Sequence, residues 1–183
     1  MTIFYTASIR GLTKYKQNYD LIYKTIKSLG NKYIGNYPFK VTTNEVYSYN
    51  EDEILDFFHT LESFMKKCDL MILELSTHSV SMGYMIMKQL SMKKPVIALY
   101  TKSNKPAFLA GIDDDNFQLI EYDLHNVKKL LIDAIEYAKG NNNSRFNLML
   151  NPSLTQYIES ESDKENISKA AFIRQLIKDH KKS

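Results

Sequence analysis

The chain has 183 residues, enough for one ordinary domain with a small appendage and too few for two full domains. Hydrophobic residues make up 44% and charged residues 25%, as in globular proteins, and a net charge of +3 gives no strong argument for binding nucleic acid or membranes. The single cysteine, Cys68, cannot form an internal disulfide, and the sequence has neither a membrane-spanning stretch nor a long hydrophobic signal region. We therefore expect a cytoplasmic protein without a membrane segment.

The first part of the chain predicts strands alternating with helices. Residues 3–6 form a short apolar strand, residues 14–29 repeat apolar side chains at helical spacing, and Gly30 is placed to end that helix. Residues 31–50 combine Pro38 with several Asn and Tyr residues, and we expect a strand and a long loop there. The apolar stripe of a second amphipathic helix follows, formed by Ile54, Phe57, Phe58, Leu61 and Met65.

The central part has the pattern of buried parallel strands. Residues 69–75 and 95–100 are nearly continuous apolar runs, as expected of strands covered on both faces, and a helix at about 82–93 joins them. A weaker strand at 117–122 and a helix at 127–138 come next. This alternation implies right-handed crossovers, so we predict an α/β fold: an open parallel flavodoxin- or Rossmann-like sheet with helices on both faces.

Two polar loops are expected at the ligand-binding edge of this sheet. Sites in such sheets form beyond the carboxyl ends of the strands, where residues 8–11 and 76–84 lie. Their hydroxyls, backbone amides and arginine, ahead of a helix N-terminus, suit a phosphate group. Two polar loops with an ordinary surface arginine are the simpler alternative. The four histidines have no metal-ligand spacing and residues 113–115 are typical of a solvated turn, so we expect neither a metal nor a cofactor.

The sequence changes character beyond the last predicted helix. Residues 140–144 form a polar, turn-rich linker, and residues 145–150 alternate apolar and polar side chains as in a strand. Asn151 and Pro152 mark the start of one helix, and another is expected at about 168–182. One strand and two short helices cannot bury a core alone, so we expect this segment to pair with another copy, in a homodimer or a higher even-numbered oligomer.

Several anchors in the first three-quarters of the chain fall in the order and spacing of a known family. They are the run from Ile3 to Gly11 (Ile-Phe-Tyr-Thr-Ala-Ser-Ile-Arg-Gly), Cys68-Asp69, Glu74, Ser76, Ser79, Gly83-Tyr84 and Lys94-Pro95. On these residues the segment 1–139 resembles the nucleoside 2-deoxyribosyltransferase-like family, most closely its 2′-deoxynucleoside 5′-phosphate N-hydrolase branch. The resemblance implies that a nucleotide or nucleoside phosphate binds, with its phosphate held by Ser8, Ile9, Arg10, Gly11, Ser79 and Gly83.

The same resemblance implies that the family's catalytic positions have lost their polar groups. The glutamate nucleophile that follows the Gly-Tyr pair in the family is here Met85, which can neither attack the anomeric carbon nor stabilise an oxocarbenium-like state. The family's aspartate corresponds to Leu61 and its first-strand tyrosine to Phe4. Glu74, Glu62 and Asp56 are the candidate substitute carboxylates, although we expect Glu74 to keep the structural role of its family counterpart. We therefore expect an inactive pseudoenzyme; the rival interpretation is an active nucleoside or nucleotide N-glycosidase, or a deoxyribosyltransferase, with a rearranged active site.

The last part of the chain resembles a second family. The run from Arg145 to Pro152, a helix, a turn and the run from Ile167 to Ile177 are similar to the ribbon-helix-helix family, to which Arc repressor belongs, so residues 145–183 are expected to dimerise and bind DNA. The resemblance implies base readers on the strand and backbone contacts at the second helix. These positions are occupied by Arg145, Asn147, Met149, Ser168 and Lys169. The segment carries seven basic and five acidic residues, a net charge of only +2, so a structural dimer whose tail only oligomerises is the alternative to a dimeric, nucleotide-binding DNA regulator.

Overall fold

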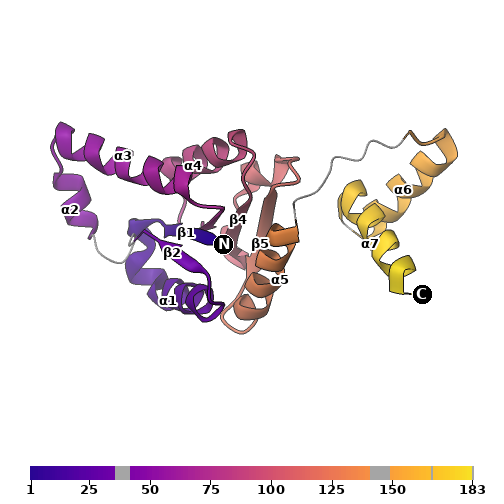
Figure 1. Cartoon of the computed structure of the whole chain (residues 1–183), viewed down its shortest axis with the longest axis horizontal. Coiled ribbons are helices and arrows are strands. Elements are labelled where there is room, and N and C mark those ends of the chain that lie inside the picture. Colours follow the sequence, from indigo (N-terminus) through magenta and orange to yellow (C-terminus); the bar gives the residue numbers. More distant parts are fainter. Residues whose placement is uncertain (36–41, 141–148, 166, 183) are drawn as a thin grey trace. The chain divides into compact units, whose positions relative to one another are not determined.

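A five-stranded parallel sheet forms the centre of the first of two units into which the chain divides, residues 1–142 and 143–183. The computed structural model describes residues 1–35, 42–140, 149–165 and 167–182 (Figure 1). In chain order the strands are β1 (Thr2–Ala7), β2 (Lys32–Ile34), β3 (Leu70–Glu74), β4 (Val96–Thr101) and β5 (Phe117–Tyr122). They lie in the order β2-β1-β3-β4-β5, so the predicted open parallel α/β sheet is confirmed.

The strand register places the ends of β1, β3 and β4 at the same edge of the sheet. Ala7 at the end of β1 pairs with Glu74 at the end of β3, and Glu74 pairs with Leu99 of β4. The chain runs from β1 to β2 in one direction across the sheet and reaches β3 on the other side of β1. The gap between the loops that leave β1 and β3 is the topological switch point, where open α/β sheets bind ligands.

Helices cover both faces of the sheet, as its alternating side chains require. Ile3 and Tyr5 of β1 pack in one apolar cluster with α1 (Leu12–Ser28) and α5 (Val127–Gly140). Phe4, between them in sequence, packs in a second cluster with α3 (Glu51–Lys67) and α4 (Val80–Ser91). Both clusters contain buried apolar residues from β3 and β4, which explains the continuous apolar runs of these strands.

One helix was not anticipated. Residues 43–48 form α2 (Thr43–Ser48), where the sequence predicted only a strand and a long loop. The strand is present as β2, but the prediction of a loop was wrong for this stretch. A capping box explains the helix: the Thr42 side chain accepts a hydrogen bond from the backbone N–H of Glu45, and the Glu45 carboxylate accepts one from the backbone N–H of Thr42. Gly30, in contrast, follows the end of α1 as predicted, with a φ of 69° that favours glycine.

The second unit contains two helices, α6 (Pro152–Lys164) and α7 (Lys169–Lys182), close to their predicted bounds. The Asn151 side chain caps α6 by accepting a hydrogen bond from the backbone N–H of Leu154, and Tyr157 and Phe172 bring their ring centroids to 6.2 Å across the pair. Most of the predicted strand at 145–150, and linker residues 141–144, lie outside the described residues; Met149 and Leu150 are described and belong to no strand.

No helix within the described ranges is long and apolar enough to cross a lipid bilayer.

Candidate functional site

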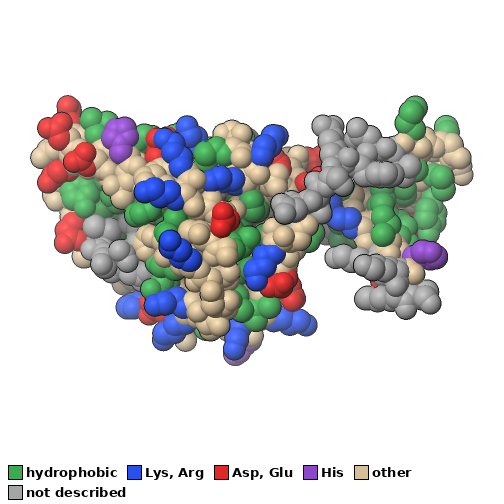
Figure 2. Space-filling model, viewed as in Figure 1, with side chains coloured by type: hydrophobic (Ala, Val, Ile, Leu, Met, Phe, Trp, Pro, Cys, Tyr) green, Lys and Arg blue, Asp and Glu red, His purple; other side chains and the backbone are tan. Residues whose placement is uncertain are grey.

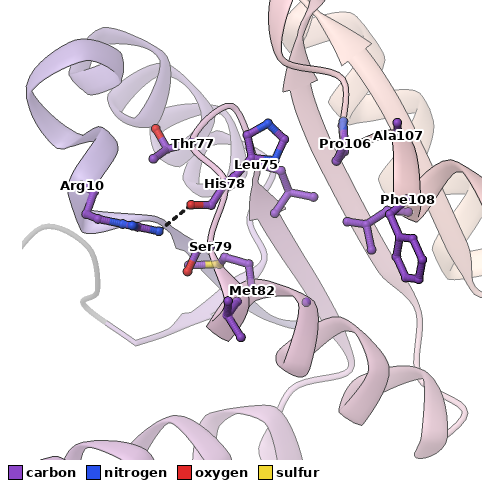
Figure 3. A pocket seen from close by; sticks show the side chains of 12 residues that line it. Arg10, Leu75, Thr77, His78, Ser79, Met82, Pro106, Ala107 and Phe108 are labelled. Atoms are coloured by element: carbon purple, nitrogen blue, oxygen red, sulfur yellow. Dashed lines mark hydrogen bonds between the residues drawn. The ribbon is translucent and has the colours of Figure 1, made fainter.

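A pocket of about 450 Å³ opens at the carboxyl edge of the sheet (Figure 3). Three segments that are far apart in the sequence line it: the loop after β1, the loop from β3 into α4, and the short 3₁₀ helix at Ala107–Gly111 after β4. Its described lining residues are Arg10, Leu75, Thr77, His78, Ser79, Val80, Met82, Gly83, Pro106, Ala107, Phe108 and Leu109. Three of the six residues implied to bind phosphate, Arg10, Ser79 and Gly83, therefore meet in one pocket.

The polar side of the pocket combines a guanidinium group with the start of a helix. Arg10 donates a hydrogen bond from Nη2 to the carbonyl oxygen of His78 over 2.5 Å, and Figure 3 shows this bond reaching from the β1 loop to the β3 loop. Ser79 is the N-cap of α4, and its side chain makes no capping hydrogen bond with the described residues. The first turn of α4 carries no acidic residue. Its N–H groups and helix dipole therefore favour an anion at this end of the pocket.

The opposite side of the pocket is apolar and was not anticipated from the sequence. Pro106, Ala107, Phe108 and Leu109 form it, and the Phe108 side chain is 95% exposed. Figure 3 shows Pro106 and Phe108 across the pocket from Arg10 and Ser79. An exposed aromatic ring beside a polar anchor suits a flat, partly apolar group such as a nucleobase. The sequence signal is Pro106 and the apolar run that follows it, separated by five residues from the predicted strand at 95–100.

The other three implied phosphate residues lie behind the pocket. Ser8 and Ile9 are buried, and the carbonyl oxygen of Ser8 accepts hydrogen bonds from the Gly11 backbone N–H at 3.0 Å and the Tyr19 hydroxyl at 3.1 Å. A Cβ atom on Gly11 would lie 2.2 Å from the Tyr19 hydroxyl oxygen and 2.4 Å from Oγ1 of Thr77. Glycine is therefore required where the β1 loop approaches the β3 loop. Ser8, Ile9 and Gly11 thus form the packed backbone around Arg10 and do not line the pocket themselves.

Glu74 holds the edge of the sheet together beneath the pocket. Its side chain is fully buried and its Oε1 accepts hydrogen bonds from the backbone N–H and the hydroxyl of Ser76 and, at 2.9 Å, from the hydroxyl of Tyr122. The Ser76 hydroxyl oxygen in turn accepts the backbone N–H of Thr101 at 2.9 Å. Burial raises the pKa of Glu74 above its ordinary value of 4.5, although these hydrogen bonds oppose the shift. Glu74 does not line the pocket, and this environment is that of a structural carboxyl group.

The three positions that the family resemblance marks as catalytic lie together in apolar surroundings. Phe4 and Met85 are buried and Leu61 is half-buried, and all three belong to the cluster between the sheet, α3 and α4. The rings of Phe4 and Phe64 have centroids 5.5 Å apart. None of the three side chains lines the pocket. The substitutions therefore form one continuous apolar packing surface.

The part of the chain that the structure describes contains no group of three His, Cys, Asp or Glu side chains arranged to hold a metal ion.

Glu74→Gln should change how stability depends on pH. Because the folded protein raises the pKa of this carboxyl, the wild-type protein loses stability as pH rises from about 4.5 through the raised pKa. The variant keeps an acceptor oxygen and cannot ionise. The difference between its free energy of unfolding and that of the wild type should therefore increase, in favour of the variant, by at most about 1.4 kcal/mol for each pH unit of rise across this window. Urea unfolding between about pH 4 and about pH 8 measures the difference. Glu121→Gln, at an exposed residue of β5, is the control; a difference that stays constant with pH for Glu74→Gln would contradict the assignment.

Comparisons with known proteins complete the description. The sequence matches no family model and no curated protein. Among solved structures, 41 chains match the fold. One is the CMP N-glycosidase BcmB of Clostridium botulinum, with 19% sequence identity and a TM-score of 0.47 over 73% of this chain and 97% of that chain. At that identity and TM-score, we assign no activity to this chain from the likeness.

Proposed function

We propose that residues 1–139 bind a nucleotide or nucleoside phosphate and do not cleave its N-glycosidic bond. The observation that carries the proposal is the two-sided pocket at the switch point of the sheet. Arg10, Ser79 and the start of α4 lie on one side, and the apolar segment with Phe108 lies on the other. A phosphate and a base are linked within one nucleotide, so a single ligand satisfies both sides.

The phosphate is assigned to the side of Arg10. A guanidinium group has five N–H donors, and the hydrogen bond to the His78 carbonyl leaves others to contact an anion. That hydrogen bond also fixes the direction of the side chain, which reduces the entropy lost when an anion binds. The Ser79 hydroxyl and the backbone N–H groups that begin α4 add neutral donors on the same side.

The absence of glycosidase chemistry is inferred from the lack of a suitably placed carboxylate. N-glycosidic cleavage of the family's type needs a carboxylate near the anomeric carbon. None of the described residues that line the pocket is an aspartate or a glutamate. Glu74, the candidate substitute, is fully buried and bound to Ser76 and Tyr122. Catalysis by Glu74 would first require exposure of its carboxyl group, which would break the hydrogen bonds that hold the sheet edge.

Arg10→Ala should weaken binding of deoxynucleoside 5′-phosphates by about tenfold or more. A charge-assisted hydrogen bond contributes about 1.5–3 kcal/mol. Among the described residues that line the pocket, Arg10 is the only Lys or Arg residue, so the substitution removes this contribution. Isothermal titration calorimetry measures the affinity. Lys14→Ala is the matched control because this exposed lysine, four residues away, does not line the pocket. Unchanged binding in Arg10→Ala would place the phosphate elsewhere.

The purified protein should release no free base from deoxynucleosides or their 5′-phosphates above background. The physical reason is that Met85, Leu61 and Phe4 supply no acid, base or nucleophile. Chromatography of the reaction mixture detects base release directly. Turnover that is present in the wild type and lost in Glu74→Gln, with the variant still folded, would show that Glu74 is the catalytic carboxylate and the silent-enzyme proposal is wrong.

We propose, from the ribbon-helix-helix resemblance, that residues 145–183 bind DNA as a dimer; the structure supports the association step, because the two helices leave apolar side chains uncovered. Ile158 and Phe172 are buried, but α6 and α7 also expose large side chains: Leu154, Tyr157, Leu176 and Ile177. A unit this small needs a second copy to cover them. Ser168 caps α7, its hydroxyl oxygen accepting a hydrogen bond from the Ala171 N–H, while Lys169 forms an ion pair with Glu159. Met149 is 99% exposed, and Arg145 and Asn147 lie outside the described residues.

Asn147→Ala in the full chain should keep the oligomeric state and cost about 1–3 kcal/mol of preference at one base pair. The reason is that a residue that reads a base contributes discrimination between base pairs, whereas the apolar side chains contribute association. A selection from random DNA, followed by binding measurements over a range of salt concentrations, tests this. Gln175→Ala, an exposed position of α7, is the control. Absence of salt-dependent DNA binding by the wild type would leave the tail as an oligomerisation segment only.

A further inference from the structure

The charges of the first unit are distributed unevenly over the two faces of its sheet. The helices α1 and α5, which pack together on one face, carry seven lysines and three acidic residues. On the other face α3 and α4 carry three lysines and five acidic residues. Figure 2 shows lysine side chains along the side of this unit where α1 and α5 lie, and acidic side chains gathered over the start of α3. One face is therefore basic, although the net charge of the whole chain is only +3.

Most lysines of this basic face have no carboxylate partner. Two of its three acidic residues are each paired with a lysine of their own helix, Asp20 with Lys16 and Glu136 with Lys139, both at 2.7 Å. Among the described residues, no carboxylate forms an ion pair with four exposed lysines: Lys24, Lys27, Lys128 and Lys129. These four cations can therefore pair with an anion from outside the chain without giving up an ion pair.

The outer surface of α1 is hollowed beside these lysines. A hollow of about 580 Å³ is lined by Lys16 and Lys24, by the neutral donors Thr13 and Gln17, and by Asp20, whose carboxylate Lys16 holds. Lysine, threonine and glutamine side chains are among those that contact the phosphates of nucleic acids. The hollow therefore offers the donor types that such a backbone requires.

We propose that this face binds the phosphate backbone of double-stranded DNA. We call it the α1–α5 basic face; it consists of Lys16, Lys24, Lys27, Lys128 and Lys129. From Lys16 to Lys27 the helix rises by about 16 Å, and a neighbouring helix axis lies about 8–10 Å away. A DNA duplex carries one phosphate charge for about every 1.7 Å of its axis, so about ten phosphates lie along that length. Several of them come within reach of the lysines of both helices.

The composition of the face distinguishes DNA from other acidic partners. The large apolar side chains that the described residues expose lie outside α1 and α5, for example Phe58 and Tyr84 on α3 and α4. Protein contacts have an apolar centre, and amphipathic helices insert apolar side chains into membranes. Protein–DNA interfaces are more polar and more positively charged. The choice of DNA among nucleic acids rests on the function proposed for residues 145–183, whereas the basic face itself belongs to the first unit.

The test is the salt dependence of binding between the full-length protein and a DNA duplex of random sequence, measured by fluorescence anisotropy. Lys24→Gln combined with Lys129→Gln removes one cation from each helix. Each phosphate contact contributes about −0.9 to the slope of the logarithm of the association constant against the logarithm of salt concentration, so the slope should become shallower by about 2. Lys66→Gln combined with Lys67→Gln is the matched control, because it removes the same charge from exposed residues of α3 and should leave the slope unchanged.

Circular dichroism and a melting curve establish that each variant is folded. A wild type without salt-dependent binding, or a folded Lys24→Gln and Lys129→Gln variant with the slope of the wild type, would overturn the proposal. Binding to vesicles of anionic phospholipid that only this variant loses, with duplex binding unchanged, would assign the face to a lipid surface instead.

Failure of this proposal is distinguishable from failure of the proposed function of the tail. Asn147→Ala concerns base preference and should leave the salt slope unchanged. If the tail reads no bases, Asn147→Ala changes no preference, while the slope still responds to Lys24→Gln combined with Lys129→Gln. If the basic face binds no DNA, the slope does not respond to that pair of substitutions, whatever Asn147→Ala does.

Discussion

The buried carboxyl group of Glu74 is the interaction on which the ligand-binding edge depends. A carboxyl removed from water must be hydrogen-bonded, because an unsatisfied buried polar group costs about 1–3 kcal/mol. Ser76 of the next loop and Tyr122 at the end of β5 donate hydrogen bonds to one of its two oxygens, Oε1, and the Ser76 hydroxyl oxygen accepts the backbone N–H of Thr101 at the end of β4. The Glu74 side chain, together with Ser76, thus connects the ends of β3, β4 and β5. The loop that carries His78 and Ser79 to the start of α4 begins at this point.

The position of Arg10 follows from that loop. Gly11 fits only because it has no Cβ, and it brings the β1 loop against Thr77. Arg10 is then within hydrogen-bonding distance of the His78 carbonyl. The Arg10 side chain is therefore positioned by contacts from the β1 loop and from the β3 loop, on the two sides of the switch point. Ser8 and Ile9 take part in this placement although they do not line the pocket.

The three positions that the family resemblance marks as catalytic share one apolar environment. Phe4, Leu61 and Met85 belong to one apolar cluster, so each side chain gives the others a non-polar environment. Restoring one carboxylate at position 85 would bury a charge among Phe and Met side chains, which is strongly unfavourable without a paired partner. An apolar group at one of these positions therefore favours apolar groups at the other two. This shared packing supports the proposal that the site does not cleave an N-glycosidic bond.

Sequence patterns predicted most elements because local periodicity reports which side of a helix or strand is apolar. They missed α2, whose capping box at Thr42 and Glu45 is a short-range signal within a segment rich in turn-forming residues. Of the residues that line the pocket, the family resemblance named Arg10, Ser79 and Gly83 but not Phe108, because the place of Phe108 opposite Arg10 results from pairing between β3 and β4. Periodicity also could not tell that the stripe of α3 is covered at Met65 and exposed at Phe58, since that depends on how far the sheet extends beneath the helix.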